Sequence, residues 1–99
     1  MAYPGIQLFD LKGRTALVTG GSKGLGKAIA DGFASAGASI VLVSRHGHEA
    51  ASAAAEIAAD HGVHTLGLEA DITDQEQIAS MIASTTKSFG GLDILVNSA

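Results

Sequence analysis

Short apolar runs alternate with longer amphipathic stretches along the whole of the 99-residue chain. The run at 39–43 is branched and apolar without polar alternation, which is typical of strands buried on both faces of a parallel sheet. Similar short runs at 15–18, 63–68 and 94–96 predict three more strands. The chain therefore contains four candidate strands at regular intervals.

Between these strands, apolar residues recur at spacings of three and four, which places them on one face of a helix. The predicted helices run from Leu25 to a stop at Gly37, over 48–61, and from an N-cap at Thr73 or Asp74 to the glycines at 90 and 91. The expected buried faces are Leu25, Ala28, Ile29, Phe33 and Ala36, then Ala50, Ala54, Ile57 and Ala58, then Ile78, Met81, Ile82, Thr85 and Phe89.

The resulting β-α-β-α-β-α-β order requires parallel strands joined by right-handed crossovers, with an expected spatial order of 3-2-1-4. The fold class is α/β, the N-terminal portion of a doubly wound parallel (Rossmann) sheet. We assign residues 1–99 to a single incomplete domain, in which 1–13 is a lead-in whose Leu8, Phe9 and Leu11 cover one edge of the sheet. Ligands of such sheets bind beyond the carboxyl ends of the strands, where the strand order reverses.

The first strand leads into the sequence Thr-Gly-Gly-Ser-Lys-Gly-Leu-Gly at 19–26. A glycine turn between a strand and a helix lets the backbone approach a ligand, and the first helical amides favour an anion such as phosphate. Gly20 would make the exit from the strand, Gly24 would leave room for a pyrophosphate, and Gly26 would let the helix press against the neighbouring strand. An ordinary glycine-rich loop is the alternative.

Composition excludes several classes of function. The net charge is −4, cysteine is absent, and the N-terminus shows neither a secretory signal nor a membrane span. These features give no attraction for nucleic acid or an anionic membrane and no thiol chemistry, and they favour a cytoplasmic location. The pairs His46/His48 and His61/His64 have no cysteine or convergent carboxylate to complete a metal site, so we expect none.

Three features together resemble the N-terminal part of the short-chain dehydrogenase/reductase family. They are Thr-Gly-x-x-x-Gly-x-Gly at 19–26, Asp71 after the third strand, and Leu-Asp-Ile-Leu-Val-Asn-Ser-Ala at 92–99. The usual fourth-strand motif of the family is Asn-Asn-Ala-Gly, which this sequence matches at Asn97 and Ala99 but not at Ser98. The resemblance covers essentially the whole chain and implies a dinucleotide-binding domain.

The resemblance also implies roles for individual residues. Asp71 would accept the adenine amino group, Ile72 would pack on the adenine, Asn97 would brace the central strands, and Ala99 would lie against the cofactor ribose. Asp93 has a structural role at the start of the fourth strand. The residues that would surround the pyrophosphate and the adenosine ribose are Gly20, Ser22, Gly24, Leu25 and Gly26.

Charge at the end of the second strand indicates which cofactor is bound. NAD sites place an acidic residue there to hold the ribose 2'-hydroxyl, but this chain has Ser44 followed by Arg45. A guanidinium can bind a 2'-phosphate through paired charged hydrogen bonds, and Lys23 adds a second cation. His46 is a further candidate beside the phosphate. We therefore expect NADP(H) rather than NAD, the alternative being that these cations are solvated surface charges.

The residues by which the family acts on substrate, a Ser and a Tyr-x-x-x-Lys pair beyond the fourth strand, are missing. The only tyrosine is Tyr3, with Gln7 four positions later, so no catalytic residue is assigned and the chain alone is expected to be inactive. The complete enzyme would interconvert a small carbonyl compound and an alcohol as a homo-oligomer. The opening segment, residues 9–22, resembles gluconate 5-dehydrogenases about as well as it resembles 3-oxoacyl reductases. The alternatives are a truncated product that only binds dinucleotide or a subunit, and a regulatory nucleotide-binding domain.

Overall fold

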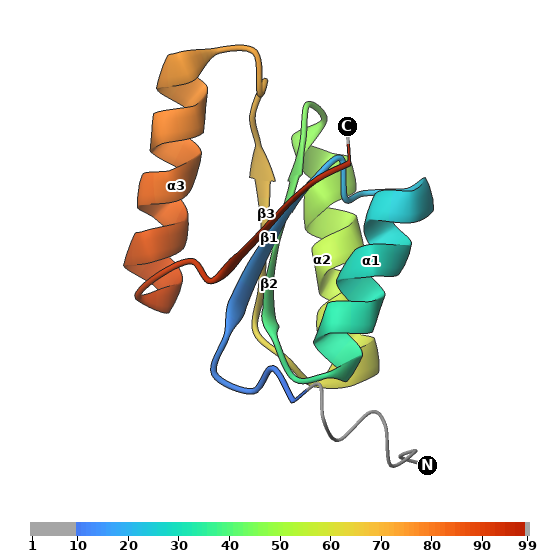
Figure 1. Cartoon of the computed structure of the whole chain (residues 1–99). Coiled ribbons are helices and arrows are strands. Elements are labelled where there is room, and N and C mark those ends of the chain that lie inside the picture. Colours follow the sequence, from blue (N-terminus) through green and yellow to red (C-terminus); the bar gives the residue numbers. More distant parts are fainter. Residues whose placement is uncertain (1–9, 99) are drawn as a thin grey trace.

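A computed structural model of the chain describes residues 10–98, which form one sheet with helices on both of its faces (Figure 1). The predicted roles of Leu8, Phe9 and Ala99 therefore lie outside the described residues. The elements in chain order are β1 (Thr15–Thr19), α1 (Gly24–Ser35), β2 (Ser39–Ser44), α2 (Gly47–His61), β3 (Thr65–Glu69), α3 (Gln75–Phe89) and β4 (Ile94–Asn97).

The four strands form a parallel sheet in the order β3-β2-β1-β4, which confirms the predicted doubly wound topology. Leu17 of β1 stands opposite Val41 of β2 and Leu95 of β4, so the two central strands are in register with the fourth. Figure 1 shows α1 and α2 against one face of the sheet and α3 against the other. Because the strands are parallel, their carboxyl ends share one edge of the molecule.

Each central strand buries side chains on both faces, which explains the unbroken apolar runs in the sequence. Val18 and Ile40 belong to the core cluster under α1 and α2, together with Ile57 of α2. Leu17 and Val41 belong to the cluster on the opposite face, under α3. Full burial of a side chain of this size stabilises the fold by about 1.5–3 kcal/mol, so the sheet centre is the main source of stability.

The buried face of α1 agrees with the predicted one only in part. Phe33 of the predicted set is partly buried and packs against the core cluster under this helix. The fully buried residues of α1 are Gly26, Ala30 and Ala34, whereas Leu25 is 73% exposed and Ala28 is also exposed. Both sets have helical spacing, but the small set permits a closer approach to the sheet, and this decides which face is buried. Likewise, Ile82 of α3 was expected inside and is 43% exposed.

Local interactions set the helix ends close to the predicted positions. Asp74, one of the two expected N-caps, accepts hydrogen bonds from the amides of Glu76 and Gln77 at the start of α3. Gly62 and Gly90 close α2 and α3 with φ of 68° and 82°, in the left-handed region that glycine adopts without penalty. The helix lengths therefore follow directly from the sequence.

A close contact between α2 and β3 was not anticipated from the sequence. A Cβ placed on Gly67 would lie 2.6 Å from the backbone carbonyl carbon and oxygen of Ala50. Thr65 in the same strand donates a hydrogen bond to the Ala54 carbonyl of α2 over 2.8 Å. The second helix is therefore held against the edge of the sheet at the amino and central parts of β3.

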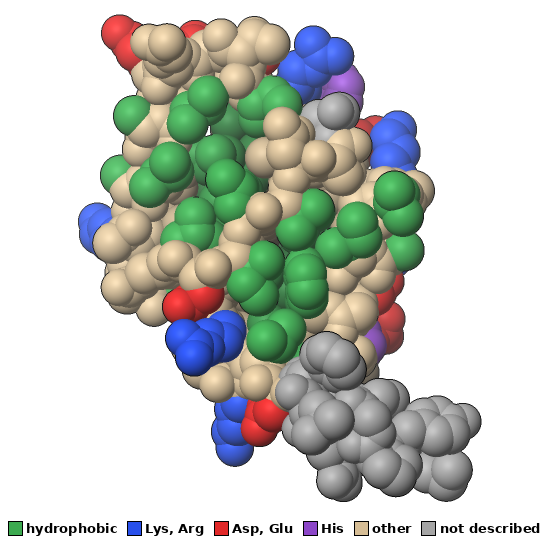
Figure 2. Space-filling view, viewed as in Figure 1, with side chains coloured by type: hydrophobic (Ala, Val, Ile, Leu, Met, Phe, Trp, Pro, Cys, Tyr) green, Lys and Arg blue, Asp and Glu red, His purple; other side chains and the backbone are tan. Residues whose placement is uncertain are grey.

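On the other side of the sheet, β4 pairs only with β1 within residues 10–98. Leu95 in this strand is 62% exposed. Figure 2 shows hydrophobic side chains gathered along β4 and over the adjoining sides of α1 and α3. The band of surface along β4 is the most apolar part of the molecule in that view.

Candidate functional site

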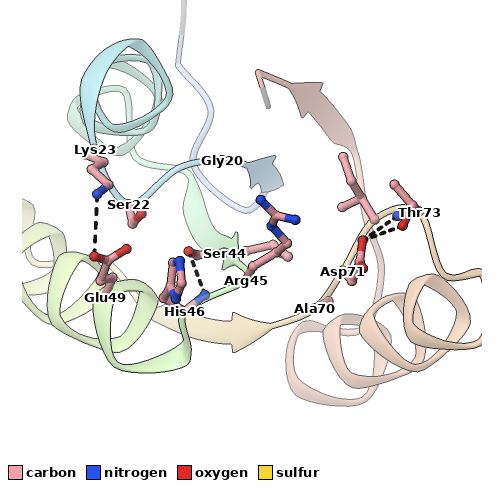
Figure 3. Close-up of a pocket in the computed structure, with 12 residues that line it drawn as sticks. Gly20, Ser22, Lys23, Ser44, Arg45, His46, Glu49, Ala70, Asp71 and Thr73 are labelled. Carbon is pink, nitrogen blue, oxygen red and sulfur yellow. Dashed lines mark hydrogen bonds and ion pairs between the residues drawn. The ribbon is translucent and has the colours of Figure 1, made fainter.

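A groove of about 360 Å³ opens at the carboxyl ends of β1, β2 and β3, where the sequence predicted a ligand site (Figure 3). It draws together the glycine loop after β1, the turn between β2 and α2, and the turn after β3. The lining residues are Gly20, Ser22, Lys23, Val43, Ser44, Arg45, His46, Glu49, Ala70, Asp71, Ile72 and Thr73.

Backbone hydrogen bonds fix the floor of the groove. The amides of Gly20 and Gly21 both donate to the Val43 carbonyl, over 2.8 and 3.4 Å, and the Ala70 amide donates to the Ser44 carbonyl over 3.0 Å. Gly20 makes its turn with a φ of 67°, as a glycine exit from the strand requires. Backbone hydrogen bonds alone thus connect the carboxyl ends of the three strands, from which the turns begin.

The glycine loop leaves the start of α1 open for a ligand. Lys23 occupies the N-cap position in an extended conformation, and its side chain does not cap the helix. Gly24 has a φ of 64°, and a Cβ there would meet no atom within 4 Å. The first amides of α1 therefore lack a side-chain acceptor, which suits an anion.

Gly26 has a different role from Gly24. A Cβ on Gly26 would collide with the Gly20 carbonyl oxygen and lie 2.6 Å from the Ser98 Oγ. Glycine is therefore required because the first turn of α1 packs on the glycine loop itself and on the residue after β4. The contact with the end of the neighbouring strand was predicted, whereas the contact with the loop carbonyl was not.

Side chains at the carboxyl end of β4 hold the residue that precedes this loop. The Thr19 hydroxyl lies 3.0 Å from Asn97 Oδ1, and the Ser98 hydroxyl donates to the Thr19 carbonyl over 2.6 Å. Asp93, at the other end of β4, accepts a hydrogen bond from the Thr15 amide over 2.8 Å. Asn97 and Ser98 connect β4 to β1 without lining the groove, and Asp93 has the structural contact that its position implied.

Basic side chains enter the groove from two sides. Arg45 and His46 follow β2, where the His46 amide donates to the Ser44 hydroxyl over 3.1 Å. Lys23 comes from the glycine loop, and its ammonium lies 3.5 Å from Glu49 Oε1 in α2. In Figure 3, Arg45 lies between the glycine loop and the turn that carries Asp71. The basic residues that were predicted to bind phosphate thus line one groove.

The Asp71 carboxylate is oriented by its own turn. The Thr73 hydroxyl and amide donate to Asp71 Oδ1 over 2.7 and 2.9 Å, and the Asp71 amide donates to Gln77 Oε1 over 2.7 Å. The Thr73 hydroxyl, followed by its amide and the nearby charge of Arg45, holds the pKa of Asp71 below its usual value. Both donors use one oxygen, which leaves Oδ2 to accept from a ligand.

This arrangement predicts a pH dependence that Thr73 controls. Because folding lowers the pKa of Asp71, its contribution to stability is present above the ordinary carboxyl pKa and is lost as the pH falls through the folded-state pKa. In Thr73→Ala the hydroxyl donor is gone, so the pKa of Asp71 should rise towards its usual value. Carboxyl ¹³C NMR titration of both proteins measures this, and an unchanged pKa would contradict the assignment.

Some predicted residues lie outside the main groove. Gly24 lines an adjoining groove of about 410 Å³ over α1 and α2, Leu25 projects into solvent, and Gly26 is buried beneath the loop. Conversely, sequence reasoning missed several groove residues, for which the only available signal was their place at a strand or helix end. They are Val43, Glu49, Ala70 and Thr73.

Residues 10–98 contain neither a candidate metal-ligand cluster nor a helix that could cross a membrane. That part of the chain has no group of three His, Cys, Asp or Glu side chains placed to hold a metal ion. His61 of α2 instead places its Nε2 atom 3.2 Å from Oδ1 of Asp31 in α1. None of the described helices is long and apolar enough to span a bilayer.

Residues 14–99 match a family model described as short chain dehydrogenase. The chain is 40% identical over 91 residues to D-threitol dehydrogenase of Mycolicibacterium smegmatis, covering 92% of this chain and 35% of that protein. It is 38% identical over 89 residues to the 3-oxoacyl-(acyl-carrier-protein) reductase FabG of Aquifex aeolicus, covering 90% and 36%. The chain thus spans about a third of the length of these curated relatives.

Solved structures give the same result. L-sorbose reductase of Gluconobacter frateurii, complexed with NADPH and L-sorbose, superimposes with a TM-score of 0.88 at 42% identity, over 92% of this chain and 35% of that one. The NADPH-dependent 3-quinuclidinone reductase of Rhodotorula rubra gives a TM-score of 0.86 at 29% identity, over 96% and 36%. The likeness extends over nearly all of the chain in both cases.

Proposed function

The chain belongs to the short chain dehydrogenase family, and we propose that it is the NADP(H)-binding portion of an oxidoreductase that interconverts a carbonyl and an alcohol by hydride transfer. Members of this family bind nicotinamide dinucleotides. In this proposal the 99 residues form one incomplete dinucleotide-binding domain, and the segment at 1–13 leads into it.

The observation that carries the proposal is the convergence of three turns on one groove. The glycine loop brings the open start of α1, the turn after β2 brings Arg45 and His46, and the turn after β3 brings Asp71. Backbone amides and a helix start suit a pyrophosphate, cations suit a third phosphate, and a carboxylate suits the adenine amino group. The donors and acceptors present therefore fit a phosphorylated dinucleotide.

Each part of the chain has a binding task in this account. The first amides of α1 and the Ser22 hydroxyl would hold the pyrophosphate, and Arg45 with Lys23 would hold the 2'-phosphate. Asp71, fixed by Thr73, would orient the adenine, with Ile72 against its face. Asn97 would keep β1 and β4 aligned beneath the nicotinamide half. When bound, the nicotinamide would supply the hydride.

Arg45 is the main reason for proposing NADP(H) rather than NAD. The last residue of β2 is Ser44 and not the acidic residue of an NAD site, and the Arg45 guanidinium occupies the next position. Two relatives whose structures are named with NADPH, L-sorbose reductase and 3-quinuclidinone reductase, agree with this choice. The names of these relatives also favour a small carbonyl or alcohol substrate, without selecting one compound. A homo-oligomeric complete enzyme and a cytoplasmic location are further parts of the proposal.

The proton donor and the substrate-holding residues would lie outside these 99 residues, so we expect dinucleotide binding without turnover. Titration of the purified chain should give a dissociation constant for NADPH at least about tenfold below that for NADH, because charged hydrogen bonds to the 2'-phosphate are each worth about 1.5–3 kcal/mol. NADPH fluorescence and competition by NADH measure this.

Assays with NADPH and a panel of ketones should show no rate above the blank. Equal affinities for the two dinucleotides would contradict the cofactor assignment, and measurable turnover would contradict the absence of catalytic residues. A chain that binds NADPH without turnover is also compatible with the alternative, a truncated product that only binds dinucleotide. Coding sequence downstream of Ala99 that contains a Ser and Tyr-x-x-x-Lys would decide in favour of the enzyme.

A further inference from the structure

Glu49 is a groove residue to which the proposed cofactor site gives no task. It lies in the first turn of α2. Its Oε1 is 3.5 Å from the Lys23 ammonium, while Oε2 is buried and has no hydrogen-bond partner among the described residues. Figure 3 shows the side chain directed towards the glycine loop. A carboxylate oxygen shielded from water without a donor is unfavourable, so this side chain is not optimised for stability alone.

The position of Glu49 brings it close to the cations proposed for the third phosphate. It lines the main groove together with Arg45 and His46. Glu49, Lys23 and Ser22 also line the adjoining groove. The Glu49 side chain is 32% exposed, whereas Lys23 is 77% exposed and ends in a flexible ammonium group. Glu49 is therefore the more buried member of the ion pair, and it places negative charge at the groove.

We propose that Glu49 is a specificity-determining residue that weakens the preference for NADP(H) by engaging Lys23. The inference rests on the proposed function of the same groove. A 2'-phosphate needs the Lys23 ammonium and is repelled by the Glu49 carboxylate, whereas the 2'-hydroxyl of NAD(H) is neutral. The carboxylate therefore lowers the affinity for the phosphorylated dinucleotide selectively.

The test is Glu49→Gln, which keeps the shape of the side chain and removes its charge. NADPH should bind about three- to tenfold more tightly than to the parent chain, since one nearby charge in a partly exposed groove acts at this scale. NADH affinity should change by less than about twofold. The gain for NADPH should shrink at high ionic strength, because salt screens such charges.

Glu56→Gln is the matched control for net charge. Glu56 lies on the same helix and pairs with Lys27 over 2.8 Å, but it does not line the main groove. Its substitution should change NADPH affinity by less than about twofold. Circular dichroism of both variants should match the parent, because each change is at a partly exposed side chain.

A double-mutant cycle shows whether Glu49 acts through Lys23. In a Lys23→Gln background, the gain in NADPH affinity from Glu49→Gln should be smaller than in the parent chain, because the ion pair is already broken and only the direct repulsion of the 2'-phosphate remains to be relieved. An equal gain in both backgrounds, an unchanged NADPH affinity in Glu49→Gln, or weaker binding of both dinucleotides would overturn the inference while leaving the proposed function intact. If the parent chain binds neither dinucleotide, the proposed function fails and the inference fails with it.

Discussion

Arg45→Asp should reverse the order of dinucleotide affinities. The substitution removes the guanidinium from the groove at the end of β2 and replaces it with a carboxylate that repels a 2'-phosphate and can accept from a 2'-hydroxyl. Loss of charged hydrogen bonds and added repulsion should weaken NADPH binding about 30- to 100-fold, while NADH binding strengthens. Fluorescence titration with NADPH and competition with NADH provide both constants.

Lys87→Asp provides the control for the charge change in this experiment. Lys87 is exposed in the last turn of α3, which precedes β4 and so lies at the amino end of the sheet, away from the groove. It should leave the ratio of the two affinities within about twofold of the parent, because exposed charges beyond a Debye length are screened. A parallel loss of NADPH affinity in Lys87→Asp would mean that net charge, and not Arg45, governs the preference.

Gly26→Ala should destabilise the fold and disrupt the glycine loop. The new methyl group would collide with the Gly20 carbonyl oxygen and press on the Ser98 hydroxyl, so α1 must move away from the loop. Overpacking of this kind costs about 1–3 kcal/mol in the free energy of unfolding, and displacement of the first helical turn should also weaken NADPH binding. Urea unfolding followed by circular dichroism measures the first effect.

Gly32→Ala in the same helix is the matched control. A Cβ on Gly32 would meet no atom within 4 Å, and the residue is exposed in the middle of α1. This substitution should stabilise the protein by up to about 1 kcal/mol, because alanine is the better helix former. If both variants had the same stability as the parent, the packing role of Gly26 would be wrong.

The topology could be predicted because strand and helix periods differ and because a branched apolar run such as 39–43 is typical of a strand that is covered on both faces. The parallel order then brought the carboxyl ends of β1, β2 and β3 together, so the positions of Arg45 and Asp71 on one groove also followed. The element types depend on local sequence patterns, and the strand order and the place of the groove depend on the rules for connections between parallel strands. Neither requires the packing of side chains to be known.

Packing details could not be predicted in this way. The face of α1 depends on how closely Ala30 and Ala34 approach the sheet, and a spacing of three and four fits the exposed Leu25 equally well. The contact of Gly67 with the backbone of α2 requires the two elements to be placed first. Glu49 was missed because an acidic residue in the first turn of a helix is ordinary helix chemistry and points to no site.

The most direct test of the proposed site is a titration of the ¹⁵N-labelled chain with NADPH, followed by ¹H–¹⁵N correlation spectra. We expect the amides of the glycine loop, Arg45 and the turn at Asp71 to shift. The groove of about 490 Å³ at the opposite end of the sheet, which Gly37 and His64 help to line, should show no change. Shifts confined to that opposite end, or no shifts at saturating NADPH, would contradict the assignment of the dinucleotide to the carboxyl ends of the strands.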